Sequence, residues 1–297
     1  MISKNTKGEK IFLFFNYIII ALLAGISLFP IINILAVSFS SASAATAGEV
    51  KLWPVGFTLS AYKFVASNKI FFSTFFVSIK RVLLAVPLSV FIIIMAAYPL
   101  SLTTSKFKMR PYYAWFFLFS IIFSGGLIPY LLTIQMVGII NTIWALVLPL
   151  SAPVFYIIIM MNFFKGIPPE LGEAAAVDGA SHMRILWQIF VPISKPAIAT
   201  IVLLCFILQW NSWFDGLLLI NNPRNYPLQS YLQTIVVNTM DINAMARNPE
   251  QWKLIQLVAE RTVKSAQIFI AIIPVMVIYP FMQKSFTKGL VMGAVKG

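Results

Sequence analysis

The chain has 297 residues, of which 60% are hydrophobic and only 10% are charged, and its formal net charge is +13. Soluble globular domains carry about 25% charged residues, so this composition excludes an ordinary soluble domain and indicates a polytopic membrane protein. The basic residues form short clusters between apolar runs rather than one stripe with interleaved aromatics. This distribution argues against nucleic-acid binding and fits the excess of Lys and Arg on the cytoplasmic loops of membrane proteins.

About 20 apolar residues are needed to cross the hydrocarbon core of a bilayer. Six runs reach this length, and in chain order they are residues 11–37, 72–102, 113–134, 139–164, 198–220 and 268–286. The predicted fold is therefore an all-α polytopic membrane protein with six transmembrane helices, in a single transmembrane domain over residues 1–297. No segment between the runs is long enough for a soluble domain.

Two of these runs are interrupted. Lys80 and Arg81 lie inside the second run, so its membrane portion is expected to begin near Val82. The pair Gly125-Gly126, followed by Pro129, lies inside the third run and predicts a kink or an unwound segment. Such a break is tolerated only where protein or a cavity covers the freed backbone groups.

The orientation follows from basic residues near short loops. They gather before the first run, after the second and in the tail, as Lys4, Lys7, Lys10, Lys106, Lys108, Arg110, Lys284, Lys288 and Lys296. Both termini are therefore expected in the cytoplasm. Residues 165–197 then form a cytoplasmic loop and residues 221–267 an extracellular one. Lys80 and Arg81 oppose the bias, but are tolerable as snorkelling ends of a helix.

The loop at 165–197 is a polar island that predicts a helical hairpin. Pro168 and Pro169 suit a helix start, and Gly179 can adopt the left-handed conformation that ends a helix. Four apolar residues then recur at helical spacing, which indicates a second short helix: Met183, Leu186, Trp187 and Phe190. Pro192 and Pro196 are expected to end that helix. The pattern alone fits a hairpin resting on the membrane as well as it fits a docking surface for a partner.

The motif Glu173-Ala174-Ala175-x-x-Asp178-Gly179-Ala180, followed by Ile189-x-x-Pro192, resembles the EAA loop of ABC importer permeases. The resemblance implies that this hairpin, between the fourth and fifth spans, forms coupling helices that insert into a cleft of an ATP-hydrolysing subunit. By the same resemblance Glu173 meets a basic group of the ATPase, the small Ala174 and Ala175 allow close approach, and Gly179 sets the bend.

Further segments are similar to one subgroup of that family, the maltose-type carbohydrate permeases, and in particular to its branch for oligosaccharide or polysaccharide uptake. They include Leu52-Trp53-Pro54-Val55-Gly56-Phe57, Ser124-Gly125-Gly126-Leu127-Ile128-Pro129, Trp210-Asn211-Ser212-Trp213-Phe214-Asp215 and the ending from Gly289 to Gly297. Nearly the whole chain from about Ser38 is covered.

The resemblance also implies the location and the partners of this chain. The chain is expected to span the plasma (inner) membrane of a bacterium several times. Its partners are a second, homologous permease subunit that completes a heterodimer, two ATP-binding subunits, an extracellular solute-binding protein, membrane lipid and a sugar substrate. No phosphate-binding motif G-x-x-x-x-G-K-[ST] is present in the sequence. The chain is therefore expected to be no enzyme and to bind no cofactor itself, with ATP and Mg held by the partner ATPase.

A group of polar and aromatic residues in the fifth run is the candidate substrate pathway: Trp210, Asn211, Trp213 and Asp215. Aromatic faces stack on sugar rings, and amides and carboxylates bind hydroxyls. The other interpretation is an interfacial aromatic belt with a carboxylate at a helix end.

Two other classes of function fit the sequence less well. A membrane enzyme needs an acid–base pair or a nucleophile with its base, yet the chain has one His and one Cys. An ion-coupled secondary transporter usually shows an internal repeat and ionisable groups near mid-membrane, and neither is evident. An ABC importer permease for a solute other than a sugar is the closer alternative.

Overall fold

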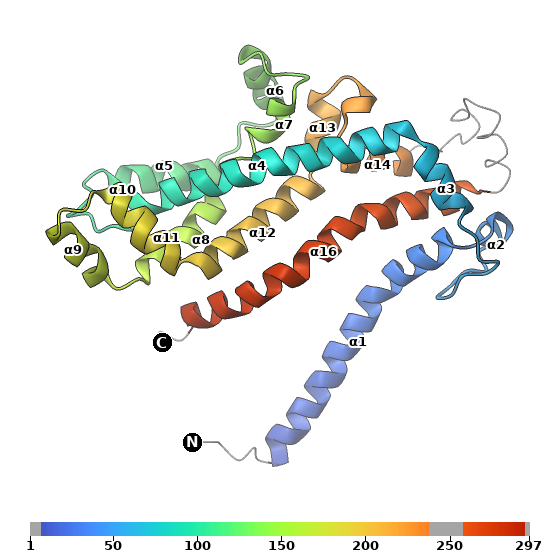
Figure 1. The fold of residues 1–297 in the computed structure, drawn as a ribbon, viewed down its shortest axis with the longest axis horizontal. Coiled ribbons are helices and arrows are strands. Elements are labelled where there is room, and N and C mark those ends of the chain that lie inside the picture. Colours follow the sequence, from blue (N-terminus) through green and yellow to red (C-terminus); the bar gives the residue numbers. More distant parts are fainter. Residues whose placement is uncertain (1–6, 238–257, 295–297) are drawn as a thin grey trace. The chain divides into compact units, whose positions relative to one another are not determined.

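The structure, a computed structural model, describes residues 7–237 and 258–294, with side chains described to residue 280. Within these residues all regular secondary structure is helical, which confirms the predicted all-α class. Figure 1 shows the helices and their labels.

Three helices are each long and apolar enough to cross a membrane, and they lie within Gly8–Ser38, Lys69–Ser101 and Glu260–Pro280. The number reaches six if each of three bent helix pairs is taken as one span. The helix α1 (Lys7–Ser38) covers the first predicted run, α4 (Lys69–Ser101) the second and α16 (Glu260–Ala294) the sixth. All three contain proline, which is tolerated in membrane helices.

The backbone groups into two compact units. The first comprises Met1–Lys69 and Thr234–Ile272, and the second Ile70–Gln233 and Ile273–Gly297. In the first unit, the short helices α2 (Ala42–Ala47) and α3 (Ser60–Ser67) follow α1. Ala36 and Val37 of α1 form a small core with Ala44, Ala45 and Val50. The Arg261 guanidinium donates a hydrogen bond to the Ala45 carbonyl at 3.1 Å.

The second unit contains most of the helices. Besides α4 from Ile70 on, they are α5 (Arg110–Ile122), α6 (Leu127–Met136), α7 (Ile143–Val147), α8 (Val154–Lys165), α9 (Pro169–Val177), α10 (His182–Ile185), the π-helical turn η1 (Leu186–Phe190), α11 (Val191–Ile193), α12 (Lys195–Asn211), α13 (Phe214–Leu219) and the 3₁₀ turn η2 (Pro223–Asn225). The helix α14 (Leu228–Val237) belongs to this unit up to Gln233. One of the unit's core clusters joins apolar faces of α4, α8, α12 and the α10–η1 segment.

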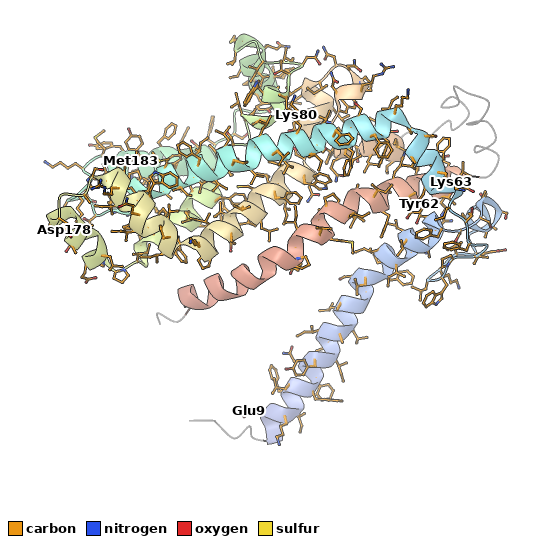
Figure 2. All side chains as sticks on the ribbon, in the orientation of Figure 1. Glu9, Tyr62, Lys63, Lys80, Asp178 and Met183 are labelled. Carbon is orange, nitrogen blue, oxygen red and sulfur yellow. The ribbon has the colours of Figure 1, made fainter. Side chains whose placement is uncertain are left out.

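Three of the predicted runs are divided. The third run splits into α5 and α6, which meet at 118° across the segment that holds Gly125-Gly126, where a kink was predicted. The fourth run splits into α7 and α8, because Pro149 and Pro153 both lack the N–H that would continue the helix. The fifth run splits into α12 and α13 at residues 212–213. The helix α4 is continuous through Lys80 and Arg81, which interrupt the second run in its hydropathy and not in its backbone. Figure 2 labels Lys80 on this helix.

The two long predicted loops contain structure of their own. Residues 165–197 hold α9, α10, η1 and α11. The segment 221–267 holds η2, α14 and the first residues of α16, which starts earlier than the predicted sixth run. Residues 238–257 of that segment lie outside the described residues.

Candidate functional site

The helical hairpin at 165–197 has the start and bend that its sequence specifies. Pro169 is the first residue of α9, and Glu170 lies in its first turn at the positive end of the helix dipole. Gly179 has φ +78°, the left-handed conformation that glycine adopts without strain. The Ala180 N–H donates to the Ala175 carbonyl at 2.9 Å and the Gly179 N–H to the Ala176 carbonyl at 3.1 Å. These two bonds form a Schellman motif, which ends α9 and sets the turn.

The residues of the EAA-like motif divide between the surface and the core. Glu173, Ala174, Asp178 and Gly179 are exposed. Ala175 and Ala180 are half-buried and pack against the core cluster that α4, α8 and α12 share. One face of α9 is therefore fastened to the protein, while the other stays accessible to a partner.

The apolar stripe that was predicted for the second helix of the hairpin is only half buried. Leu186 and Phe190 are buried, whereas Met183 and Trp187 are exposed. The Ser181 hydroxyl caps the helix by accepting from the Arg184 N–H at 3.4 Å. Pro192 was expected to end the helix, and the helical backbone that begins at His182 ends at Ile193, the residue after Pro192. The bend comes at Ser194, where the hairpin meets α12 at 85°.

An aromatic trio fastens the hairpin to the spanning helices. Tyr98 of α4 lies edge-on to Phe190, with ring centroids 5.1 Å apart, and to Phe164 of α8 at 6.5 Å. The Phe164 and Phe190 rings are 5.5 Å apart, also edge-on. The Tyr98 hydroxyl lies 3.3 Å from His182 Nδ1. Such ring pairs add about 0.5–1.5 kcal/mol each beyond their buried area, so the trio attaches the hairpin to α4 and α8.

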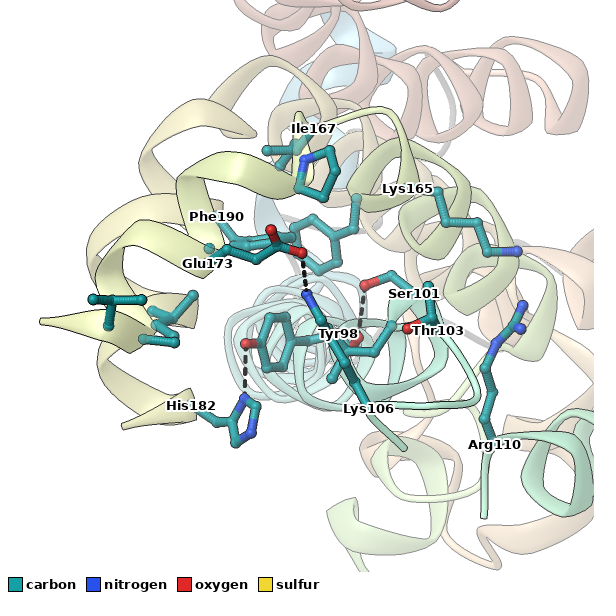
Figure 3. Close-up of a pocket in the computed structure, with 17 residues that line it drawn as sticks. Tyr98, Ser101, Thr103, Lys106, Arg110, Lys165, Ile167, Glu173, His182 and Phe190 are labelled. Carbon is teal, nitrogen blue, oxygen red and sulfur yellow. Dashed lines mark hydrogen bonds and ion pairs between the residues drawn. The ribbon is translucent and has the colours of Figure 1, made fainter. Parts of the chain in front are cut away.

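A cavity of about 730 Å³ lies between the hairpin and the ends of α4, α5 and α8. Figure 3 shows its lining, with Glu173 on one wall and Lys106 opposite. The Lys106 ammonium donates to Glu173 Oε1 at 2.8 Å. Both side chains are about half exposed, so this ion pair contributes at most about 1 kcal/mol. Glu173 can therefore exchange this partner for another cation at little cost.

The four residues of the candidate substrate pathway do not share one environment. Trp210 is only 1% exposed; it stacks on Phe206 at 5.8 Å and lies edge-on to Phe75 at 6.0 Å. Asp215 is also buried. Asn211 and Trp213, which flank the break between α12 and α13, are exposed. The structure thus brings two of these side chains into the interior and leaves two accessible.

Asp215 belongs to a buried polar cluster that is centred on Arg81. The Arg81 side chain is 0% exposed and pairs with both carboxylate oxygens of Asp215. Its Nε donates to Gln209 Oε1 at 2.9 Å, and its Nη1 reaches the Ser212 carbonyl at 3.4 Å. Arg81 thereby provides a partner for a carbonyl at the end of α12, where helix carbonyls lose their own partners.

Asp215 is held from its own side of the break as well. Its Oδ1 accepts from the Ser212 hydroxyl at 2.8 Å and from the Gly216 N–H at 2.9 Å. A charge-assisted hydrogen-bond network therefore stabilises the break between α12 and α13.

Sequence reasoning missed three residues of these sites. Arg81 was read as a snorkelling helix end, and its burial corrects that interpretation. A charged residue inside an apolar run was itself the available signal, because such residues are usually paired and face the interior. Tyr98 and Lys106 gave no local signal, since their partners lie 84 and 67 residues away in the sequence. In the described part of the chain, no group of three or more His, Cys, Asp or Glu residues could hold a metal ion.

Three comparisons place the chain among known proteins. Residues 54–291 match the family model described as binding-protein-dependent transport system inner membrane component. The chain is 36% identical to protein LplC of Bacillus subtilis (strain 168) over 293 residues, which cover 99% of this chain and 97% of that protein. It is 33% identical to the polygalacturonan/rhamnogalacturonan transport system permease protein YtcP of the same organism, over 97% of this chain and 99% of that protein.

A solved structure agrees. A chain in the crystal structure of a bacterial ABC transporter involved in the import of the acidic polysaccharide alginate superposes with a TM-score of 0.83 at 33% sequence identity, covering 95% of this chain and 98% of that one. The all-helical fold, the hairpin with its EAA-like motif and these full-length matches agree with one another. The chain belongs to the family of binding-protein-dependent transport system inner membrane components.

Proposed function

We propose that this protein is the permease subunit of an ATP-driven importer of carbohydrates, with oligosaccharides as the substrate class. Three relatives support the substrate class by their names: a polygalacturonan/rhamnogalacturonan permease, a lactose permease of Rhizobium radiobacter that is 27% identical, and the alginate importer. The observation that carries the proposal is the hairpin, which exposes Glu173, Ala174, Asp178 and Gly179 while its other face is fixed to the core.

In this proposal the exposed face of the hairpin docks on an ATPase subunit. Glu173 exchanges Lys106 for a cation of the ATPase, and the small side chain of Ala174 lets the two surfaces approach closely. Ala175 and Ala180 hold the hairpin against the core, and Gly179 sets the bend that presents the exposed face. Closing of the ATPase moves the hairpin, and the trio of Tyr98, Phe164 and Phe190 carries that movement into the spanning helices. Docking that differs between two states shifts the opening of the pathway from one side of the membrane to the other.

The α12–α13 break supplies the proposed contact with the sugar. Trp213 and Asn211 are the exposed members, so they stack on a sugar ring and bind its hydroxyls. Trp210 and Asp215 support these two residues from the interior and do not contact the sugar. Trp210 is packed between two aromatic rings, and the Asp215 carboxylate is already paired with Arg81.

The complete importer in this proposal contains a second, homologous permease, two ATP-binding subunits that hold ATP and Mg, and an extracellular solute-binding protein. The chain itself hydrolyses nothing. Both termini and the hairpin lie in the cytoplasm, and the segment 221–267 faces the binding protein outside.

The coupling assignment is tested with two glycines that adopt the same conformation. Gly179 has φ +78° and Gly138, between α6 and α7, has φ +74°, and a Cβ at either position would meet no atom within 4 Å. Replacing either by Ala therefore imposes the same local backbone strain, about 1–2 kcal/mol. In reconstituted vesicles, Gly179→Ala and Glu173→Ala should lower sugar uptake per ATP hydrolysed, while Gly138→Ala should not. Equal coupling in all three variants would refute the assignment.

A further inference from the structure

The cavity behind the hairpin holds more positive than negative charge. Lys106, Arg110 and Lys165 line it, together with a single carboxylate, Glu173, within the described part of the chain. Glu173 already pairs with Lys106. Two cations, Arg110 and Lys165, therefore stand in the same cavity without a compensating charge.

These two cations are neighbours. Figure 3 shows Arg110 and Lys165 side by side, with their charged ends directed toward the same space. They are close enough for their charges to repel each other. Arg110 Nε donates to the Leu100 carbonyl at 3.0 Å, which fixes the guanidinium in place. None of the ion pairs among the described side chains includes either residue. Two like charges held together in a partly enclosed space favour an anion between them.

The backbone adds to this preference. Arg110 is the first residue of α5, so the positive end of the α5 dipole faces the same region. The dipole is the backbone's contribution here, because the Arg110 N–H already donates to the Phe107 carbonyl at 3.0 Å and Pro111 has no N–H.

The residues that follow Arg110 bear on where the cavity lies relative to the lipid headgroups. Tyr112, Tyr113 and Trp115, in the first two turns of α5, are 69%, 50% and 70% exposed. Tyrosine and tryptophan gather at the level of lipid headgroups, where the ring is apolar and its polar edge stays wet. These exposed rings therefore favour headgroup depth for the start of α5, where Arg110 lies.

We infer that this cavity binds the phosphate group of an anionic phospholipid through Arg110 and Lys165. The phosphate accepts from the Nη groups of Arg110 and from the Lys165 ammonium, and the lipid chains lie along the exposed aromatic residues of α5. Because the cavity also touches Gly172 and Glu173 of α9, a bound headgroup supports the hairpin from behind and leaves its exposed face free. A phosphate from solution offers the same chemistry, but without chains that match this aromatic surface.

The test measures lipid bound to the purified importer complex. The complex is exchanged into detergent with equal amounts of phosphatidylglycerol and phosphatidylcholine, and the retained lipids are quantified by mass spectrometry. Variants are Arg110→Gln, Lys165→Gln and the double substitution. Lys108→Gln is the matched control, because Lys108 is an exposed cation in the loop between α4 and α5 and does not line the cavity. We expect the preference for phosphatidylglycerol to fall about fivefold for each cavity cation removed and to persist in the control.

Three outcomes would overturn the inference. The first is an unchanged lipid preference in the double variant, or an equal loss in Lys108→Gln. The second is release of phosphatidylglycerol by inorganic phosphate at moderate excess, which would assign the cavity to a free phosphate. The third is normal lipid retention with loss of the ATPase subunit, which would assign the two cations to carboxylates of that partner. If the double variant does not assemble, Arg110→Lys keeps the charge and is expected to retain the lipid. The lipid readout needs no transport, so failure here leaves the proposed importer function intact.

Discussion

The pair formed by Arg81 and Asp215 gives the sharpest prediction about stability. Their side chains are 0% and 9% exposed, so removing one partner leaves an uncompensated charge in the interior. Such a loss costs about 3–5 kcal/mol of the free energy of unfolding. Arg81→Met leaves the carboxylate with only the Ser212 hydroxyl and the Gly216 N–H, and Asp215→Leu leaves the guanidinium with neutral acceptors. Each single variant should be destabilised by that amount.

The double variant, Arg81→Met with Asp215→Leu, should be more stable than either single variant, because it buries two apolar side chains and no charge. The assay is denaturant titration of the purified chain in mixed micelles, followed by tryptophan fluorescence. Lys80→Met is the control, since the neighbouring Lys80 is exposed and its loss should change the free energy by no more than about 0.5 kcal/mol. If the cost of the double variant equals the sum of the single costs within about 0.5 kcal/mol, the two residues are not coupled and the reasoning fails.

Three further substitutions have defined expectations. Gly216→Ala should prevent normal folding, because a Cβ at Gly216 would overlap the Ser230 hydroxyl, and the yield of folded protein measures this. Ser78→Ala should cost about 1–3 kcal/mol in denaturant titration, since the buried Leu228 N–H, which donates to the Ser78 hydroxyl at 2.7 Å, loses its acceptor. Lys106→Ala should change the free energy of unfolding by less than about 1 kcal/mol, because it removes an exposed ion pair.

Each of these has a result that counts against it. A folded, active Gly216→Ala variant would mean that α13 and α14 can separate at that point. An unaffected Ser78→Ala variant would mean that the Leu228 N–H finds another acceptor. A large destabilisation in Lys106→Ala would mean that the hairpin depends on Lys106, in conflict with the exchange of partners proposed for Glu173.

The local features of the hairpin could be predicted because they depend on adjacent residues. Pro169 begins α9, and Gly179 adopts its positive φ, where the sequence indicates. The break at Gly125-Gly126 was predicted for the same reason. The break between α7 and α8 was not, although Pro149 and Pro153 were visible signals, because the high hydropathy of residues 139–164 suggested one continuous helix.

The long-range contacts could not be predicted in the same way. Arg81 and Asp215 are 134 residues apart, and the apolar periodicity of α4 or of α13 does not indicate which residue of another helix each of them will contact. The same holds for Tyr98 and His182, which join α4 to the hairpin. Composition and hydropathy give the number and approximate ends of the spans, whereas packing decides which face of each span is polar. The cavity lined by Arg110 and Lys165 follows from that packing.

The central claim is that import depends on ATP hydrolysis transmitted through this chain. The most direct measurement is uptake of labelled oligosaccharide into vesicles that contain this permease, its partner permease, the ATP-binding subunits and the solute-binding protein. The account predicts that uptake requires ATP with Mg and the solute-binding protein, and that it continues without an ion gradient. Uptake that follows an ion gradient when no ATPase subunit is present would contradict it.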